Sequence, residues 1–265
     1  MTQASADPSA LYMPEGGRFI PTVATIGPWD RASQHGGPTA ALLAHAIERA
    51  DAPVPMHVTR ITFDLLRPIP LSPIEIRTDV VRSGKRVSVV DAVMLTGDVA
   101  VMRASALRIR AADLDLPGNV LPDDGPPGAP GDGELAIELP GGPGYNDLGV
   151  EIRFLEGGFQ TPGPATAWVR LRIPVVAGED ATPLLRAAAA ADLGNGLSSV
   201  LPMREWRYIN PDLTIHLGRP PSGEWVALKS VTYPFDTGAG LAESALYDGT
   251  GRIGRSVQSL FIDRQ

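Results

Sequence analysis

The chain has 265 residues, of which 43% are hydrophobic and 20% are charged. These fractions are close to globular averages and exclude a disordered or fibrous chain. The formal net charge of −7 disfavours a nucleic-acid partner, because phosphate binding needs a basic surface. The chain contains no cysteine, which excludes disulfides and thiolate nucleophiles. Its four histidines lack metal-ligand spacing, so we expect no metal.

The first nine residues lack the basic and apolar regions of a signal peptide. The most apolar stretch, residues 184–201, is interrupted by Arg186, Asp192 and Asn195 and is therefore a poor membrane span. We therefore expect a cytoplasmic protein that does not contact a membrane.

The first half predicts one helix and four strands. The helix begins at His35-Gly36-Gly37-Pro38, where proline suits the first turn, and ends before Asp51. Alternating apolar residues and turn glycines then predict strands over residues 58–65, 74–83, 86–96 and 99–110.

The middle of the chain, residues 116–144, is too rich in Gly and Pro for a long helix or a central strand. We interpret it as a linker. The predicted organisation is a tail over residues 1–18, a first repeat over 19–115, the linker over 116–144 and a second repeat over 145–265.

The second half repeats this order of elements. A helix is predicted over 184–191, followed by strands over 213–217, 225–233, 240–247 and 252–263. Arg67-Pro68 and Arg219-Pro220 each follow an alternating strand and lie 152 positions apart (219 − 67), and the turn glycines Gly97 and Gly249 lie 152 apart as well. These patterns predict an α+β double hotdog, in which each of two repeats has a long helix wrapped by an antiparallel sheet.

Two familiar motifs fail in context. Gly249, Gly251 and Gly254 spell GxGxxG, but the chain ends at Gln265, before the helix and acidic residue that a dinucleotide site needs. We predict a hairpin turn there. No GxSxG motif supports a serine nucleophile.

Three polar residues stand out on apolar elements. Asp192 follows five alanines on a helical face that also carries Leu185 and Ala188, and burial without a cation would raise its pKa toward the range of a general base. Gln258 lies inside the apolar closing strand, and Asn210 precedes the strand over 213–217. We expect the three side chains to converge on one pocket that faces the His35 turn of the other repeat, and to share a water molecule.

The segments WDRASQHGGPTAALL, FDLLRP, AAADLGNGL, LTIHLGRP and SVQSLF occur in an order that resembles the acyl-CoA thioesterase II family of double-hotdog enzymes. The resemblance covers about Phe19 to Arg264, apart from the linker. It implies hydrolysis of an acyl-CoA in fatty acid metabolism without a cofactor, and association into a homo-oligomer. The family holds its hydrolytic water with an Asp, a Thr or Ser and a Gln.

Asp192 and Gln258 match this set directly, whereas Asn210 stands where the family has a hydroxyl. The resemblance also places the amides of Gly36 and Gly37 near the thioester carbonyl, with His35 beside them.

Two alternatives stay open. Asp30 and His35 have the spacing of hotdog hydratases, although the Asn-Pro pair that normally lies between them is missing. A non-catalytic acyl-CoA or lipid binder would explain the departure at Asn210.

Overall fold

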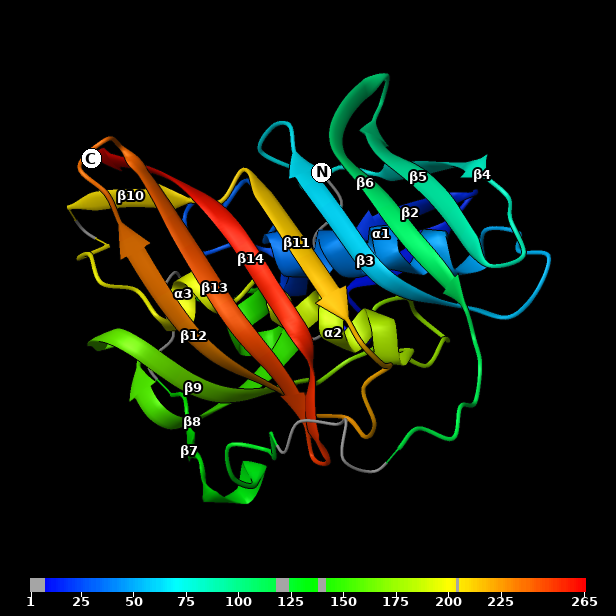
Figure 1. The fold of residues 1–265 in the computed structure, drawn as a ribbon. Coiled ribbons are helices and arrows are strands. Elements are labelled where there is room, and N and C mark those ends of the chain that lie inside the picture. The colour runs from blue at the N-terminus through cyan, green and yellow to red at the C-terminus, as the bar shows by residue number, and fades with distance from the viewer. Residues whose placement is uncertain (1–7, 118–123, 138–141, 204) are drawn as a thin grey trace.

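The computed structural model describes residues 8–117, 124–137, 142–203 and 205–265. Within these residues the strands form one sheet in the order β1-β2-β4-β5-β6-β3-β11-β14-β13-β12-β9-β8-β7, and β10 pairs with β14. All the strand pairs are antiparallel. The helices lie behind the sheet in the view of Figure 1.

The first half contributes β1 (Tyr12–Glu15), β2 (Arg18–Pro21), α1 (Gly36–Arg49), β3 (Met56–Leu65), β4 (Ile74–Arg82), β5 (Val87–Thr96) and β6 (Val99–Arg110). A 3₁₀ turn, η1 (Val23–Thr25), precedes α1. The α1 helix packs its buried residues, which include Leu42, Leu43 and Ile47, against β3, β4, β5 and β6. The predicted helix and four strands of this half are all present.

The second half contributes η2 (Pro130–Asp132), β7 (Glu134–Leu135), η3 (Tyr145–Gly149), β8 (Val150–Gly158), β9 (Thr161–Leu171), α2 (Pro183–Ala191) and α3 (Gly194–Leu197). The strands β10 (Trp206–Ile209), β11 (Asp212–Leu217), β12 (Val226–Pro234), β13 (Ala239–Asp248) and β14 (Gly251–Arg264) follow. The predicted second helix and its four strands correspond to α2, β11, β12, β13 and β14.

The strands of the two halves coincide at an offset of 152 positions. The bounds of β4 and β5, moved by 152, are those of β12 and β13, and β6 moves onto the start of β14. The neighbouring strands β3 and β11 join the halves in the centre of the sheet (Figure 1). From this junction the order β6, β5, β4 on one side matches β14, β13, β12 on the other. The fold is therefore a double hotdog.

The structure differs from prediction in the segments before the main helix of each repeat. Within the predicted tail, Leu11 and Tyr12 donate backbone hydrogen bonds to Pro174 and Val175, and Tyr12 is fully buried. The predicted linker contains η2 and β7, and β8 and β9 were not predicted at all. Gly157, Pro162 and Pro164 interrupt the alternation in β8 and β9, and the pairing of these two strands is irregular from Phe154 onward.

Among the described residues, no helix combines the length and the apolar character needed to cross a membrane.

Candidate active site

The two main helices run antiparallel, so that the end of α2 meets the start of α1. The alanine run of α2 ends at Asp192, which is the C-cap residue, and the glycine-containing α3 follows almost at once. The small alanine side chains let the helices approach closely, and the backbone oxygen of Ala189 accepts a hydrogen bond from the Tyr145 hydroxyl at 2.8 Å. Asp192 is thus held in the interior, with its side chain 4% exposed.

Two amide side chains donate hydrogen bonds to the Asp192 carboxylate. Asn210 Nδ2, just before β11, lies 2.8 Å from Asp192 Oδ1, and it also donates to the backbone of Asp212 at 3.2 Å. Gln258 Nε2, on β14, lies 3.3 Å from the same oxygen and 3.2 Å from the backbone oxygen of Asp192. The Oε1 atom of Gln258 accepts from the amide of Asn195 at 3.1 Å. Both amides therefore orient Asp192.

The other carboxylate oxygen faces the N-terminus of α1. His35, the N-cap residue, places Nδ1 3.0 Å from Asp192 Oδ2, and the nitrogen of Gly37 lies 3.0 Å from the same Nδ1. A lone pair on Nδ1 would repel the lone pairs of Asp192 Oδ2 at 3.0 Å. We therefore assign the imidazole proton to Nδ1, which donates it in a hydrogen bond to Asp192. The Gly37 N–H points toward both this nitrogen and the Asp192 carboxylate, and Nε2 of His35 keeps its lone pair.

Two glycines make this approach possible. A Cβ atom on Gly36 would lie 2.6 Å from Asp192 Oδ2, and one on Gly37 would lie 2.7 Å from the backbone oxygen of Ala189. Tyr145 packs on the other side of the site, with its ring centroid 4.8 Å from that of His35. Sequence analysis missed Tyr145 because η3, which carries it, adjoins the Gly- and Pro-rich segment that we interpreted as a linker.

Electrostatics at Asp192 differ from the prediction. Burial alone raises the pKa of this carboxyl, but the hydrogen bond from His35 and the electrostatic attraction of its imidazole, with smaller contributions from Asn210 and Gly37, outweigh burial and lower it. The prediction of a raised pKa was wrong because it did not count a hydrogen bond from His35 to the carboxylate, although the His35 turn was expected to face the same pocket. Asp192 is consequently a carboxylate anion at neutral pH.

The predicted residues meet in one cluster, but by direct contact. Asp192, Asn210, Gln258, His35 and the two glycines all belong to it, and the amides reach the carboxylate without a bridging water. Asp30 does not join them. Its carboxylate accepts from the amide of Ala32 at 2.9 Å and the hydroxyl of Ser33 at 2.8 Å, which lowers its pKa. The Asp30 and His35 pairing of a hydratase is therefore not formed.

The GxGxxG sequence forms the predicted hairpin turn. The strand β13 ends at Asp248, and β14 begins at Gly251 and contains Gly254. A Cβ on Gly254 would lie 1.9 Å from the backbone oxygen of His216, so this glycine is required by strand packing.

Family models match both halves of the chain. The acyl-CoA thioesterase N-terminal domain matches residues 25–109, and the acyl-CoA thioesterase C-terminal domain matches residues 117–262. No curated protein matches the chain.

Solved structures share the whole fold. A Thermobifida fusca protein provisionally assigned as a thioesterase II has 18% identity and a TM-score of 0.75, with all of both chains covered. A protein of unknown function with a hot dog fold from Alicyclobacillus acidocaldarius has 15% identity and a TM-score of 0.70, with 95% of each chain covered. An acyl-CoA thioesterase II, TesB2, from Mycobacterium marinum has 16% identity and a TM-score of 0.62, with 87% of this chain and 91% of that chain covered.

At these identities the structures establish the double-hotdog fold. The matched domain models establish more: the chain belongs to the acyl-CoA thioesterase family, and it is a thioester hydrolase.

Proposed function

We propose that this chain hydrolyses an acyl-CoA to free acid and CoA by means of a water molecule activated beside Asp192 and His35. The observation that carries the mechanism is the buried Asp192 carboxylate, which lies within 3.0 Å of the His35 imidazole where the two helices meet. Water adds to the thioester carbonyl carbon, the C–S bond breaks, and the CoA thiolate takes up a proton. No cofactor is needed for this step.

His35 Nε2 is the proposed base. Asp192 already accepts from Asn210, Gln258, His35 and Gly37, which satisfies about four lone-pair sites of a carboxylate. A carboxylate with a lowered pKa is also a weak base. Asp192 therefore fixes the imidazole and stabilises its protonated form, as an orienting carboxylate does for a catalytic histidine.

In a second assignment, Asp192 itself is the base that activates the water molecule, and Asn210 and Gln258 hold that water. It requires one contact to the carboxylate to open. Of the two amide partners, Gln258 is buried and Asn210 is only partly buried, which favours Asn210 as the contact that a water molecule replaces. The two assignments differ in what they predict for variants of His35.

The Gly36 N–H is the proposed donor to the thioester oxygen. It lies at the positive end of α1, and no acceptor is found for it in the described part of the chain. The Gly37 N–H is directed into the cluster, so of the predicted pair of amides only Gly36 is available.

A thiol-release assay tests this function. A panel of acyl-CoA esters from short to long should release CoA at one or more lengths, and His35→Gln should slow release about a hundredfold or more, the usual weight of a general base. Acyl-CoA binding without thiol release at any length would support the non-catalytic binder instead.

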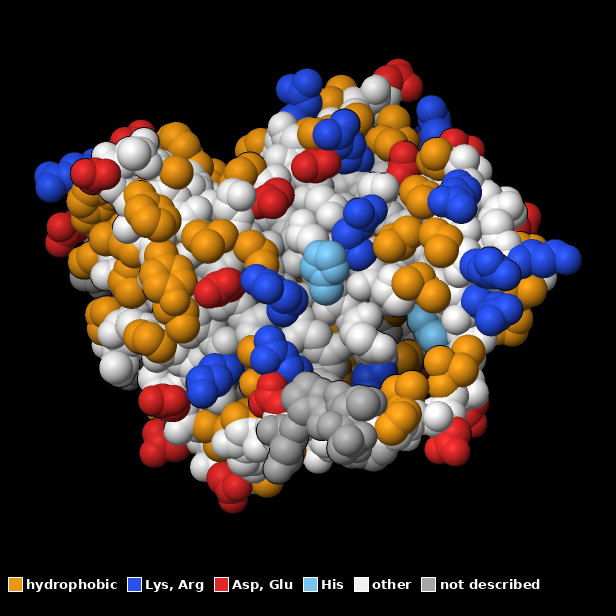
Figure 2. Space-filling model, in the orientation of Figure 1, with side chains coloured by type: hydrophobic (Ala, Val, Ile, Leu, Met, Phe, Trp, Pro, Cys, Tyr) orange, Lys and Arg blue, Asp and Glu red, His pale blue; other side chains and the backbone are white. Residues whose placement is uncertain are grey.

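We also propose a cytoplasmic homo-oligomer that acts in fatty acid metabolism. The acidic, cysteine-free composition supports the compartment. Hydrophobic side chains gather over β12, β13 and β14 on the face shown in Figure 2. The exposed ones in this region are Tyr233 on β12, Phe235 in the loop after β12, Phe261 on β14 and Ile209 on β10. A monomer in light scattering at micromolar concentration would contradict this association.

A further inference from the structure

The opposite end of the helix pair repeats the geometry of the Asp192 site. Glu48, in the last turn of α1, accepts a hydrogen bond at 2.5 Å from Thr182 Oγ1, the N-cap residue of α2. Glu48 is twelve residues from Gly36, so the two ends lie roughly 18 Å apart along α1. The two helices therefore make two polar contacts that lie well apart. We call the contact of Asp192 with His35 the first crossing and the contact of Glu48 with Thr182 the second crossing.

The strand residues at this second crossing differ from those at the first. The positions 152 before Asn210 and Gln258 are Val58 and Ala106. Aliphatic side chains thus replace both amides that orient Asp192. Space is left at this end, whereas the first crossing is filled by direct contacts.

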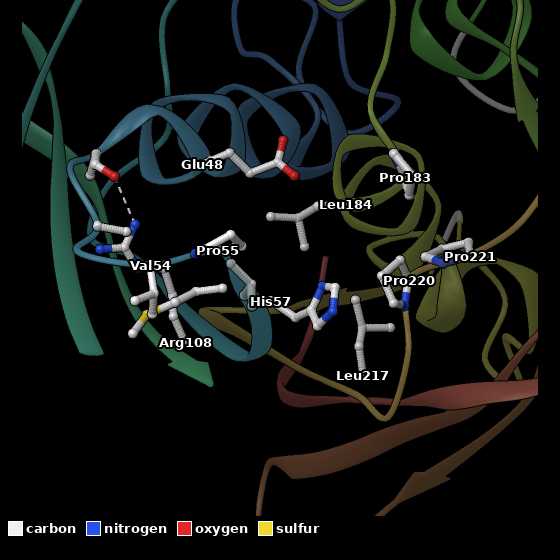
Figure 3. A pocket seen from close by; sticks show the side chains of 14 residues that line it. Glu48, Val54, Pro55, His57, Arg108, Pro183, Leu184, Leu217, Pro220 and Pro221 are labelled. Carbon is white, nitrogen blue, oxygen red and sulfur yellow. Dashed lines mark hydrogen bonds between the residues drawn. The ribbon is translucent and has the colours of Figure 1, made fainter. Parts of the chain in front are cut away.

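A cavity of about 390 Å³ occupies this region (Figure 3). Its volume lies within the range of roughly 300–1,000 Å³ that is usual for small-molecule sites. Leu184 enters it from α2, while His57 and Leu217 enter from the strands opposite (Figure 3). Most of the wall is apolar, and the charged or titratable side chains in it are Glu48, His57 and Arg108.

Arg108 is a buried cation without an ion pair. It is 3% exposed, and its guanidinium donates to the backbone oxygens of Ala50 at 2.8 Å and Asp51 at 2.7 Å and to the hydroxyl of Ser88 at 3.0 Å. Within the described residues no carboxylate forms an ion pair with it, and the charge of Asp51 offsets only part of the burial that lowers its pKa. Its buried Nε–H has no hydrogen-bond partner. Buried charges are normally paired, so an anion is the missing partner.

We infer that this cavity binds an organic monocarboxylate with an apolar body. The carboxylate accepts from Arg108, and the body fills the space among Val58, Leu184 and Leu217. A small inorganic anion would leave the apolar space empty. The bound class includes the free acids that thioester hydrolysis releases, but this site lies apart from Asp192.

Isothermal calorimetry with octanoate tests the inference. The protein carries Asp192→Asn, so that the result does not depend on hydrolysis. We expect one octanoate per chain, bound about tenfold or more tightly than the neutral methyl octanoate, which is the usual weight of a hydrogen bond to a charged group. Inorganic phosphate should show no binding.

Leu184→Trp fills the cavity without touching Arg108 and should weaken octanoate binding about tenfold or more. Val81→Trp, at a position that is 58% exposed on β4, is the matched control and should bind as before. Arg108→Met should also lose octanoate binding. Because Arg108 supports the end of α1, a thermal melt is needed to show that this variant folds. Equal binding of acid and ester, binding of phosphate as tight as that of octanoate, or unchanged binding in Leu184→Trp would overturn the inference.

Discussion

Thr62 and Thr214 hydrogen-bond to each other through their side chains, at 3.1 Å between the two Oγ1 atoms, and they occupy the same position in the two repeats. They lie 152 positions apart (214 − 62), the offset of the sequence landmarks. The flanking pairs Phe63 with Leu213 and Ile61 with Ile215 exchange under the same offset. A twofold axis between the threonines requires this pattern, so the single chain reproduces the self-complementary interface of a symmetric dimer.

A disulfide should form across this axis. Directly opposed residues of antiparallel strands have the Cα and Cβ separations that a disulfide needs, and the natural chain has no cysteine to compete. We expect Thr62→Cys with Thr214→Cys to oxidise to one intramolecular bond. Mass spectrometry of a digest would detect the crosslinked peptides of β3 and β11.

The matched control pairs Thr62→Cys with His216→Cys, which is shifted by two residues along β11. This diagonal pair should stay reduced under the same oxidant. Reduced thiols in the Thr62 and Thr214 pair, or equal oxidation of both pairs, would contradict the register and with it the symmetric duplication.

Asp192→Asn should lower kcat by about two orders of magnitude or more, because it removes the charge that stabilises protonated His35. The amide keeps the size of the carboxylate, so acyl-CoA binding should change little. Steady-state thiol release measures both parameters. Hydrolysis at the rate of the natural chain would remove Asp192 from the mechanism.

The pH profile separates the two proposed bases. If His35 Nε2 accepts the proton, kcat/KM falls on the acid side, because a protonated imidazole has no lone pair for the water molecule. His35→Gln should lose that limb as well as most of the rate. A variant that keeps the acid limb and most of its activity would assign the base to Asp192.

Gly36→Ala should abolish most activity without unfolding the chain. The added Cβ would lie 2.6 Å from Asp192 Oδ2, so the carboxylate has to move away from His35. Gly249→Ala is the control, because its Cβ meets no atom within 4 Å. Both variants should fold by circular dichroism. Full activity in Gly36→Ala would show that the close approach of Gly36 to Asp192 is not needed.

Local patterns were enough to predict most of the fold. Alternation and turn glycines located eight strands, and the landmarks at Arg67 and Arg219 predicted the offset that the strand bounds show. The missed strands β8 and β9 contain Pro162, Pro164 and Gly157, which are typical of loops. Packing of Tyr12 against the second repeat depends on contacts far apart in sequence, and no local pattern signals it.

The site was less predictable for the same reason. Asp192, Asn210 and Gln258 were recognisable as polar residues on apolar elements, together with the family resemblance. The His35 turn of the other repeat was expected to face this pocket, but its direct contact with Asp192 was not, and this contact reverses the direction of the expected pKa shift. Only the antiparallel packing of α1 and α2 brings them together.

Asp248→Asn should destabilise the hairpin that closes the second repeat. Asp248 is fully buried and accepts from Arg219, Ser222 and Thr250. Removing one partner of a buried pair costs about 3–5 kcal/mol, and we expect about 2–3 kcal/mol because the Arg219 side chain is 37% exposed. Urea unfolding measures the difference. Asp64→Asn, which breaks the exposed ion pair with Arg103, is the control and should cost less than about 1 kcal/mol.

The effect of Asp248→Asn should depend on pH in a defined direction. Burial raises the pKa of Asp248, but its bonds to Arg219, Ser222 and Thr250 outweigh burial and hold the pKa far below its ordinary value. A carboxyl with a depressed pKa stabilises the fold fully above its unfolded value, about 3.9, and progressively less as the pH falls below it. The stability gap between the natural chain and Asp248→Asn should therefore be constant from pH 8 to 6 and shrink below about pH 4. A gap that widens on acidification would show that Asp248 is not held as an anion.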